Sequence, residues 1–309
     1  SSSTPSADSR CCAKAPQASV ISAAVSEELT DVIFHRSVAL SVLAFKDFIF
    51  QLCRVSRMEI AGYGGHVGSK SNAVDLTAVH YRQQHTLLTN KGDEARGHYN
   101  QPDIYSLQKL VEVSHYNMDS RARLVFADIW TTVSAHLTST ALHSNVAVAT
   151  YAVDSFRQLG TQFLQREELA VYGFQRKFLK PLEGVMARCE HSSVKELLLK
   201  CIEQIILMFG SKNRDDNNAE ENEGHSILRS GWKPVIKVIG LTGRDADDGI
   251  AETGFNMLTT QVNRCLDESK SLTPVVLRAE HFVDLLEALL MFVSGPREEK
   301  SLLAIDQVV

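Results

Sequence analysis

The residues that come nearest to a nucleotide-binding motif form the segment GYGGHVGSKS, which runs from Gly62 to Ser71. A phosphate-binding loop uses its glycines to bring backbone amides close to phosphate, and its Lys directly follows the last Gly. Here Ser69 stands before Lys70, and residues 41–60 follow helical rather than strand periodicity. We therefore interpret the segment as a loop and not as a nucleotide site.

Residues that could hold a metal ion are scattered along the chain. A metal site needs His, Cys or carboxylate ligands that converge at helical or turn spacing. The nearest candidates are His80 with His85 and the vicinal pair Cys11 and Cys12. Neither pair follows a recognised ligand arrangement, so we predict no metal site.

Catalytic side chains are equally hard to find. His136 and His143 flank a polar connection, and we interpret them as solvated or capping groups. No nucleophile elbow, HExxH motif or pair of catalytic carboxylates stands out. The sequence thus predicts no catalytic residue and no cofactor, and we expect that the chain is not an enzyme.

The composition restricts the class of protein further. The 309 residues include 32 basic and 37 acidic side chains, so no basic excess favours nucleic acid. The apolar runs are too short and too often interrupted to span a membrane. The cysteines lack the paired spacings of a disulfide framework, which favours a reducing compartment. They stand at positions 11, 12, 53, 189, 201 and 265.

Helical periodicity dominates the chain from Glu27 onward, with apolar residues three and four positions apart. Two stripes are predicted to face a core. They are Phe126, Ile129, Trp130, Val133 and Leu137, followed by Ala149, Ala152, Val153, Phe156 and Phe163.

Later segments repeat this spacing, and several carry helix start or stop signals. Ser193 with Glu196 predicts a capping box, and Thr273 with Pro274 predicts a helix start. Gly295 with Pro296 predicts a helix end. The stripes are Val194, Leu197, Leu198, Cys201, Ile205 and Met208; then Trp232, Val235, Ile236 and Ile239, with Pro234 in the first turn; then Ala279, Phe282, Val283, Leu286, Leu290 and Val293.

The fold class follows from the succession of these segments. From Leu107 onward, about eight one-sided helices follow one another, and each pair occupies roughly 40 to 47 residues. This spacing is typical of HEAT or armadillo units. We predict an all-α fold and an α-solenoid of such helical repeats, with a closed helical bundle as the alternative.

Changes in composition suggest the domain boundaries. Residues 1–26 are predicted to be a flexible N-terminal segment, and residues 27–190 a first domain with a loop at 62–101. Residues 191–309 are predicted to form a second region. Its segment 211–226 contains the acidic run DDNNAEENE and is predicted to be a disordered loop.

One stretch, from Ser106 to Met186, places unusual polar groups inside the apolar stripes. It contains SLQKLVEVSHYNM, RARLVFADIW and YAVDSFRQLGTQFLQREELAVYGFQRKFLKPLEGVM, in that order. It resembles the region downstream of the catalytic module in the large Golgi Arf guanine-nucleotide exchange factors, the Sec-seven and brefeldin A-inhibited exchange protein family. VKELLLKCIEQII and ILRSGWKPVIKVI extend the resemblance, which covers roughly Leu29 to Phe255.

The departures from the family pattern are mild. Phe126 replaces an expected Trp, Phe156 a Leu, Leu182 a Phe, and His115 an aromatic residue. All but His115 keep an apolar side chain, so a core could adapt to them.

The resemblance implies a regulatory role. In the family this region binds membrane-bound Arf in its GTP form and relieves autoinhibition. The expected partners are therefore an Arf-type small GTPase in its GTP form, other domains of the parent exchange factor and, by peripheral contact, Golgi or trans-Golgi network membranes. A non-catalytic scaffold is the leading interpretation. The alternatives are a generic α-solenoid adaptor in intracellular transport with no Arf specificity, and an enzyme with a helical fold.

Nine residues within the resemblance are candidates for structural or partner contacts. We expect a carboxylate and guanidinium network to lock neighbouring helices, because buried charges must be paired. We also favour an inter-helix joint for the YNM segment and a core position for the Trp. The candidates are Tyr116, Asn117, Met118, Asp154, Arg157, Gln158, Phe174, Gln175 and Trp232.

Overall fold

A computed structural model describes residues 27–61, 104–164, 173–209, 228–268 and 279–306. All regular structure in these ranges is helical and no strand occurs in them, so the predicted all-α class is confirmed. The elements are α2 (Glu27–His35), η1 (Arg36–Ala39), α3 (Val42–Ile60), α5 (Tyr105–Ser120), α6 (Arg123–Ala141), α7 (Val146–Leu164), α8 (Phe174–Arg188), α9 (Ser192–Phe209), α10 (Trp232–Leu241), η3 (Thr242–Arg244), α11 (Asp248–Glu268), α12 (Ala279–Val293) and α13 (Glu298–Asp306).

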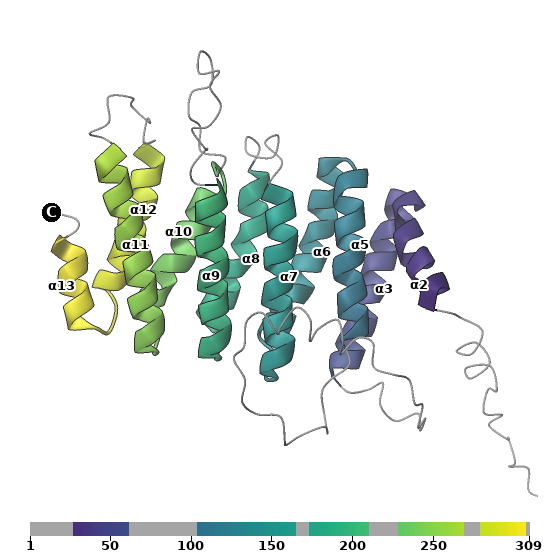
Figure 1. Cartoon of the computed structure of the whole chain (residues 1–309), viewed down its shortest axis with the longest axis horizontal. Helices are drawn as coiled ribbons and strands as arrows, with labels where there is room; N and C mark the ends of the chain where they lie inside the picture. Colours follow the sequence, from purple (N-terminus) through teal and green to yellow (C-terminus); the bar gives the residue numbers. More distant parts are fainter. Residues whose placement is uncertain (1–26, 62–103, 165–172, 210–227, 269–278, 307–309) are drawn as a thin grey trace, which may run out of the picture.

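The helices stand side by side in two layers (Figure 1). One layer contains α5, α7, α9 and α11, and the other contains α3, α6, α8, α10 and α12. From α5 onward, the chain passes from one layer to the other at each connection. The result is an elongated row with α2 and α3 at one end and α12 and α13 at the other (Figure 1).

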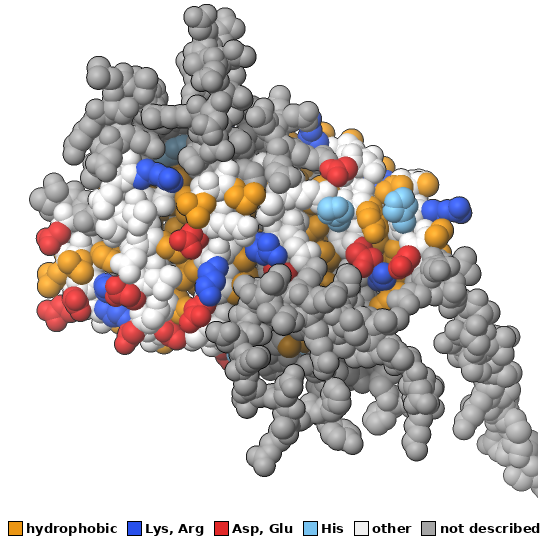
Figure 2. Space-filling view, in the orientation of Figure 1, with side chains coloured by type: hydrophobic (Ala, Val, Ile, Leu, Met, Phe, Trp, Pro, Cys, Tyr) orange, Lys and Arg blue, Asp and Glu red, His pale blue; other side chains and the backbone are white. Residues whose placement is uncertain are grey.

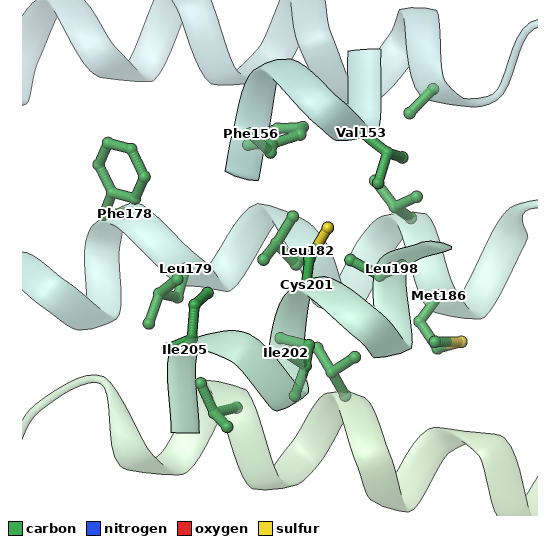
Figure 3. Close-up of a cluster of buried hydrophobic side chains, with 14 of the residues drawn as sticks. Val153, Phe156, Phe178, Leu179, Leu182, Met186, Leu198, Cys201, Ile202 and Ile205 are labelled. Atoms are coloured by element: carbon green, nitrogen blue, oxygen red, sulfur yellow. The ribbon is translucent and has the colours of Figure 1, made fainter. Parts of the chain in front are cut away.

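A single apolar core runs along the row between the layers. Both predicted stripes, on α6 and α7, are buried in it. Figure 3 shows the part of this core where α7, α8 and α9 converge, with Phe156, Leu182 and Cys201 pointing toward one another. The Trp130 and Phe178 rings stack with their centroids 3.8 Å apart, which adds to the stabilisation from apolar burial alone.

Local sequence explains where several helices begin. The Asn145 side chain accepts a hydrogen bond from the Ala147 amide at 2.9 Å and so caps α7. Gly173 precedes α8 with φ of 72°, a left-handed conformation that favours glycine. Pro234 is the third residue of α10, where its missing N–H breaks no helical bond.

The predicted capping box of α9 is not formed. The helix begins at Ser192, and the Val194 amide donates to the His191 carbonyl, so Ser193 already lies inside the helix. The predicted stripe is otherwise buried or partly buried, but Met208 is exposed because it lies in the last turn, beyond the buried Ile205 and Ile206.

The predicted core face of α12 is only partly correct, because Leu286 and Val293 pack against the core but three other residues do not. Phe282, Val283 and Leu290 were expected to be buried, and all three are exposed. The buried residues lie on a rotated face of the same helix. They are Leu285, Ala288, Leu289 and Phe292. The predicted stop at Gly295 is confirmed, because α12 ends at Val293.

Several expectations concern residues outside the described ranges. They are the glycine-containing segment 62–71, the loops 62–101 and 211–226, the N-terminal segment 1–26 and the helix start at Thr273 and Pro274. The same holds for the candidate ligands Cys11, Cys12, His80 and His85. Among the helices that are described, none is long and apolar enough to cross a membrane.

Candidate functional site

Asn117 forms the first of the polar joints between helices. It lies in the last turn of α5 and is completely buried. Its amide nitrogen donates to the Ser37 hydroxyl at 2.8 Å and to the Val113 carbonyl at 2.9 Å. Its amide oxygen accepts from Nε of Arg121 at 2.6 Å. Because a buried amide needs such partners, these bonds fix the end of α5 against η1.

Arg121 completes this joint. A terminal guanidinium nitrogen donates to the carbonyls of Ser37 and Leu40, at 2.9 and 3.0 Å. The guanidinium also lies 4.1 Å from the centre of the Phe45 ring of α3. Burial lowers the pKa of Arg121, but the arginine remains charged at neutral pH because its ordinary pKa is so high. One side chain thus connects α5, η1 and α3.

The other two residues of the YNM segment pack around Asn117. The Tyr116 ring meets the His35 ring edge to face, with centroids 5.0 Å apart. Met118 is buried in the core. The structure therefore places these residues at an inter-helix joint, together with His35.

Gln175 forms a second joint, at the start of α8. Its side chain is fully buried, and its oxygen accepts from the backbone amides of Arg229 and Gly231 at 3.0 and 3.1 Å. These amides immediately precede α10. A Cβ atom on Gly231 would lie 2.8 Å from Cδ1 of Leu228 and 3.1 Å from Cβ of Gln175, so a larger residue there would push these side chains away. The neighbouring Phe174 is partly buried against the core.

Trp232 follows this joint directly and extends it to α12. Its side chain is only 8% exposed. The indole N–H donates to the His281 carbonyl at 3.5 Å, and the two rings lie 5.2 Å apart. Phe174, Gln175 and Trp232 are thus brought together where α8, α10 and α12 meet.

Asp154, Arg157 and Gln158 form a separate group on α7. Both Asp154 oxygens accept hydrogen bonds at 2.7 Å, one from Nε of Arg157 and one from Nε2 of Gln158. All three residues belong to one helix, so these bonds do not lock neighbouring helices, contrary to our expectation. Asp154 and Arg157 are partly buried, whereas Gln158 is exposed.

Sequence reasoning missed a buried histidine between α3 and α6. The side chain of His136 is buried and lies 3.0 Å from the Ser56 hydroxyl. Burial, together with the nearby positive charge of Arg57, lowers its pKa to about 4, so the ring is neutral at pH 7. The prediction of a solvated or capping group is wrong for His136, because its face of α6 packs against α3. His143, by contrast, accepts from the Asn145 amide in a turn.

Sequence reasoning also missed an ion pair between distant segments. Lys195 of α9 lies 2.5 Å from the Asp245 carboxylate, and both side chains are largely buried. Arg297 donates to the Asp245 carbonyl at 2.8 Å and so brings the start of α13 to the same place. A separation of 50 residues between the two charges left no sequence signal for this pair.

The described residues offer little for redox or metal chemistry. Cys53, Cys189 and Cys201 are buried and unpaired, and burial raises the pKa of Cys53 and of Cys201 to about 12. Such thiols are poor nucleophiles. Within the described ranges, no group of three His, Cys, Asp or Glu side chains could hold a metal ion.

Comparisons with known proteins bear on the identity of this row of helices. Residues 162–215 match the family described as Sec7-like HDS, Mon2/Sec7/BIG1-like. The brefeldin A-inhibited guanine nucleotide-exchange protein 3 of Arabidopsis thaliana is 32% identical over 226 residues, which cover 73% of this chain and 10% of the relative. Brefeldin A-inhibited guanine nucleotide-exchange protein 1 of Arabidopsis thaliana is 39% identical over 51% of this chain and 8% of the relative. The protein of the same name in Homo sapiens is 36% identical over 50% of this chain and 8% of the relative.

These matches define the class of the chain as a helical region related to guanine nucleotide-exchange proteins. It belongs to the Sec7-like family of brefeldin A-inhibited guanine nucleotide-exchange proteins. The chain spans about a tenth or less of the length of the relatives it matches.

The expectation that the chain is not an enzyme needs correction. The relatives it matches are named as guanine nucleotide-exchange proteins. The matches do not show that this chain lacks a part in nucleotide exchange. The expectation rested on missing motifs for bond-breaking chemistry. Nucleotide exchange is a change of binding equilibrium that such motifs do not describe.

Proposed function

We propose that this chain is a regulatory, protein-binding scaffold of a large Arf exchange factor and that it recognises an Arf-type GTPase in its GTP form. The observation that carries this proposal is the identity with brefeldin A-inhibited exchange proteins, which extends over as much as 73% of the chain. The Arf partner, the position downstream of a catalytic module and the Golgi or trans-Golgi network location follow from the motif resemblance between Ser106 and Met186.

We infer that the two-layered row is an α-solenoid of HEAT or armadillo-like pairs. The alternation of the chain between layers supports this inference, because each helix then needs only its neighbours to bury its apolar face. The core continues across residue 190, so the proposed regions 27–190 and 191–309 would share one stack. Such a row leaves two long outer faces for a partner.

The candidate residues divide between architecture and contact. Asn117, Gln175 and Trp232 are buried in joints, where they would set the angles between helices and so the shape of the outer faces. Gln158 is exposed and Asp154 partly so, and they are the candidates on α7 for direct partner contact. Substitution in a joint would therefore change partner binding only through the shape of the row.

The proposed mechanism is a difference in affinity for the two states of the GTPase. If the chain binds the GTP form more tightly, newly loaded GTPase at the membrane retains the exchange factor there, and loading accelerates. Other domains of the parent protein and a peripheral membrane contact would compete for or assist the same faces.

The test is a binding measurement with the full chain immobilised. Arf loaded with a non-hydrolysable GTP analogue should be retained at least about tenfold more tightly than GDP-loaded Arf, since about 1.4 kcal/mol of coupling gives that ratio. A Ras-type GTPase in its GTP form serves as the control and should not bind. Equal retention of both Arf forms, or no retention, would overturn the proposal and favour a transport adaptor without Arf specificity.

A further inference from the structure

A groove of about 430 Å³ lies between α6 and α8. Helix α8 lines it with Lys177, Lys180 and Arg188, which are three or eight residues apart and therefore share one side of the helix. Helix α6 lines the opposite wall with Trp130, Thr131 and Ser134, among others.

The charge of this groove is positive. Lys177, Lys180 and Arg188 are all exposed at its rim. The Glu183 carboxylate, which also lines the groove, lies 2.9 Å from Nζ of Lys237 on α10 and so is already neutralised. Nε of Arg188 donates to the Gly184 carbonyl at 3.1 Å, which holds the guanidinium beside the groove. Three cations in a concave site favour an anionic ligand.

The walls of the groove also carry groups suited to a peptide backbone. The Thr131 hydroxyl donates to the Ala127 carbonyl at 3.3 Å, and the Ser134 hydroxyl donates to the Thr131 carbonyl at 3.4 Å. Both oxygens therefore keep lone pairs that can accept N–H groups. Pro181, which lies inside α8, cannot donate to the Lys177 carbonyl one turn earlier, so that carbonyl also lacks its helical partner.

Trp130 supplies a second, independent indication of a ligand. The residue is 98% buried and its ring lines the groove, yet its indole N–H has no hydrogen-bond partner among the described residues. Buried indole N–H groups usually find an acceptor. A carboxylate or carbonyl oxygen of a ligand deep in the groove would provide one, whereas the ring itself is already packed in the core, with Phe178 stacked on it.

We propose that this groove binds an acidic peptide segment of another protein. Its carboxylates would pair with Lys177, Lys180 and Arg188, its backbone would use the hydroxyls of α6, and one of its oxygens would accept from the Trp130 indole N–H. A membrane surface fits less well, because a peripheral helix anchors through large apolar side chains next to its cations. The exposed residues of α8 are Arg176, Lys177, Lys180, Ala187 and Arg188.

This site is independent of the proposed recognition of a GTPase and would remain if that proposal failed. The experiment uses the full chain and a fluorescein-labelled peptide of Glu, Asp and Leu, with the same peptide carrying Gln and Asn as the neutral control. Fluorescence anisotropy measures affinity. In a second measurement, the Trp232→Phe variant leaves Trp130 as the single tryptophan, so its emission reports on the groove itself.

The acidic peptide should bind and change the Trp130 emission, and its affinity should fall as NaCl is raised. The paired substitutions Lys177→Glu and Lys180→Glu should weaken binding about tenfold or more, because they replace attraction by repulsion. The matched control is Arg54→Glu with Lys200→Glu, which makes the same change of charge at exposed sites on α3 and α9 and should leave the affinity unchanged. All four residues are exposed, so thermal melting should show that both variants are folded.

Three results would overturn the proposal. The first is equal binding of the acidic and neutral peptides, or of neither. The second is an equal loss of affinity in the groove variant and in the control variant. The third is binding of phosphatidylserine vesicles through Lys177 and Lys180 without binding of the peptide, which would assign the groove to a membrane surface instead.

Discussion

The interior of the row and its C-terminal end use apolar residues in different ways. In the interior, α6 packs against α3, α7 and α8, and its predicted stripe is buried throughout. At the end, α12 and α13 leave large apolar side chains exposed, including Phe282, Leu290 and Leu302. In Figure 2, hydrophobic side chains are also visible at both ends of the row. Apolar periodicity thus predicts the position of a helix in both regions. It predicts which face of the helix is buried only in the interior.

The reason lies in how each helix divides its surface. A helix with neighbours on three sides has a defined polar stripe that faces water. The position of this stripe determines which residues of the helix face the core. Most residues of α12 are apolar, from Phe282 through Val293, so several rotations of the helix would bury similar areas. Packing against α10 then decides which face is buried, and the sequence of α12 does not encode that choice.

The largest expected difference in stability is between substitutions of two phenylalanines, one in each region. Phe178 is 2% exposed and stacks on Trp130 and Phe163, whereas Phe282 is 46% exposed on α12. Phe178→Ala should lower the free energy of unfolding by about 3–5 kcal/mol through lost burial and a new cavity. Phe282→Ala should lower it by less than about 1.5 kcal/mol, because much of the ring already contacts water. Urea denaturation followed by circular dichroism measures both.

A second contrast concerns a buried and an exposed histidine. The pKa of His136 is about 4 in the folded chain and about 6.5 when unfolded, so the unfolded chain binds the proton more readily. Between these two values, stability should fall as pH is lowered, by about 1.4 kcal/mol per unit and about 3 kcal/mol in all. Above pH 6.5 this residue should contribute no pH dependence.

The variant His136→Gln keeps a polar contact with Ser56 but does not titrate, so its stability should depend less steeply on pH in this window than that of the wild type. His115 is exposed on α5, and His115→Gln is the matched control, with an expected pH profile like that of the wild type. Parallel profiles for wild type and His136→Gln would show that burial of His136 does not control its protonation.

The same contrast explains what the sequence could predict. Helical content, the stripes of α6 and α7 and the importance of the YNM segment follow from spacing and motif, because they depend on neighbours within one helix. The partners of Asn117 and Gln175 could not be predicted, since Ser37 and Gly231 lie 80 and 56 residues away. The pairing of Asp154 with Arg157 and Gln158 was misjudged because charges three and four residues apart can satisfy each other within one helix.

The smallest expected effect on stability tests which face of α12 is buried. The neighbouring Leu289 and Leu290 are chemically identical, but Leu289 is 1% exposed and Leu290 is 58% exposed. Leu290→Gln should change the free energy of unfolding by less than about 0.5 kcal/mol, as exposed substitutions usually do. Leu289→Gln should cost several times more, because it buries an amide in the core. Equal costs, or a larger cost at Leu290, would restore the face predicted from periodicity and would remove the distinction between the interior and the end of the row.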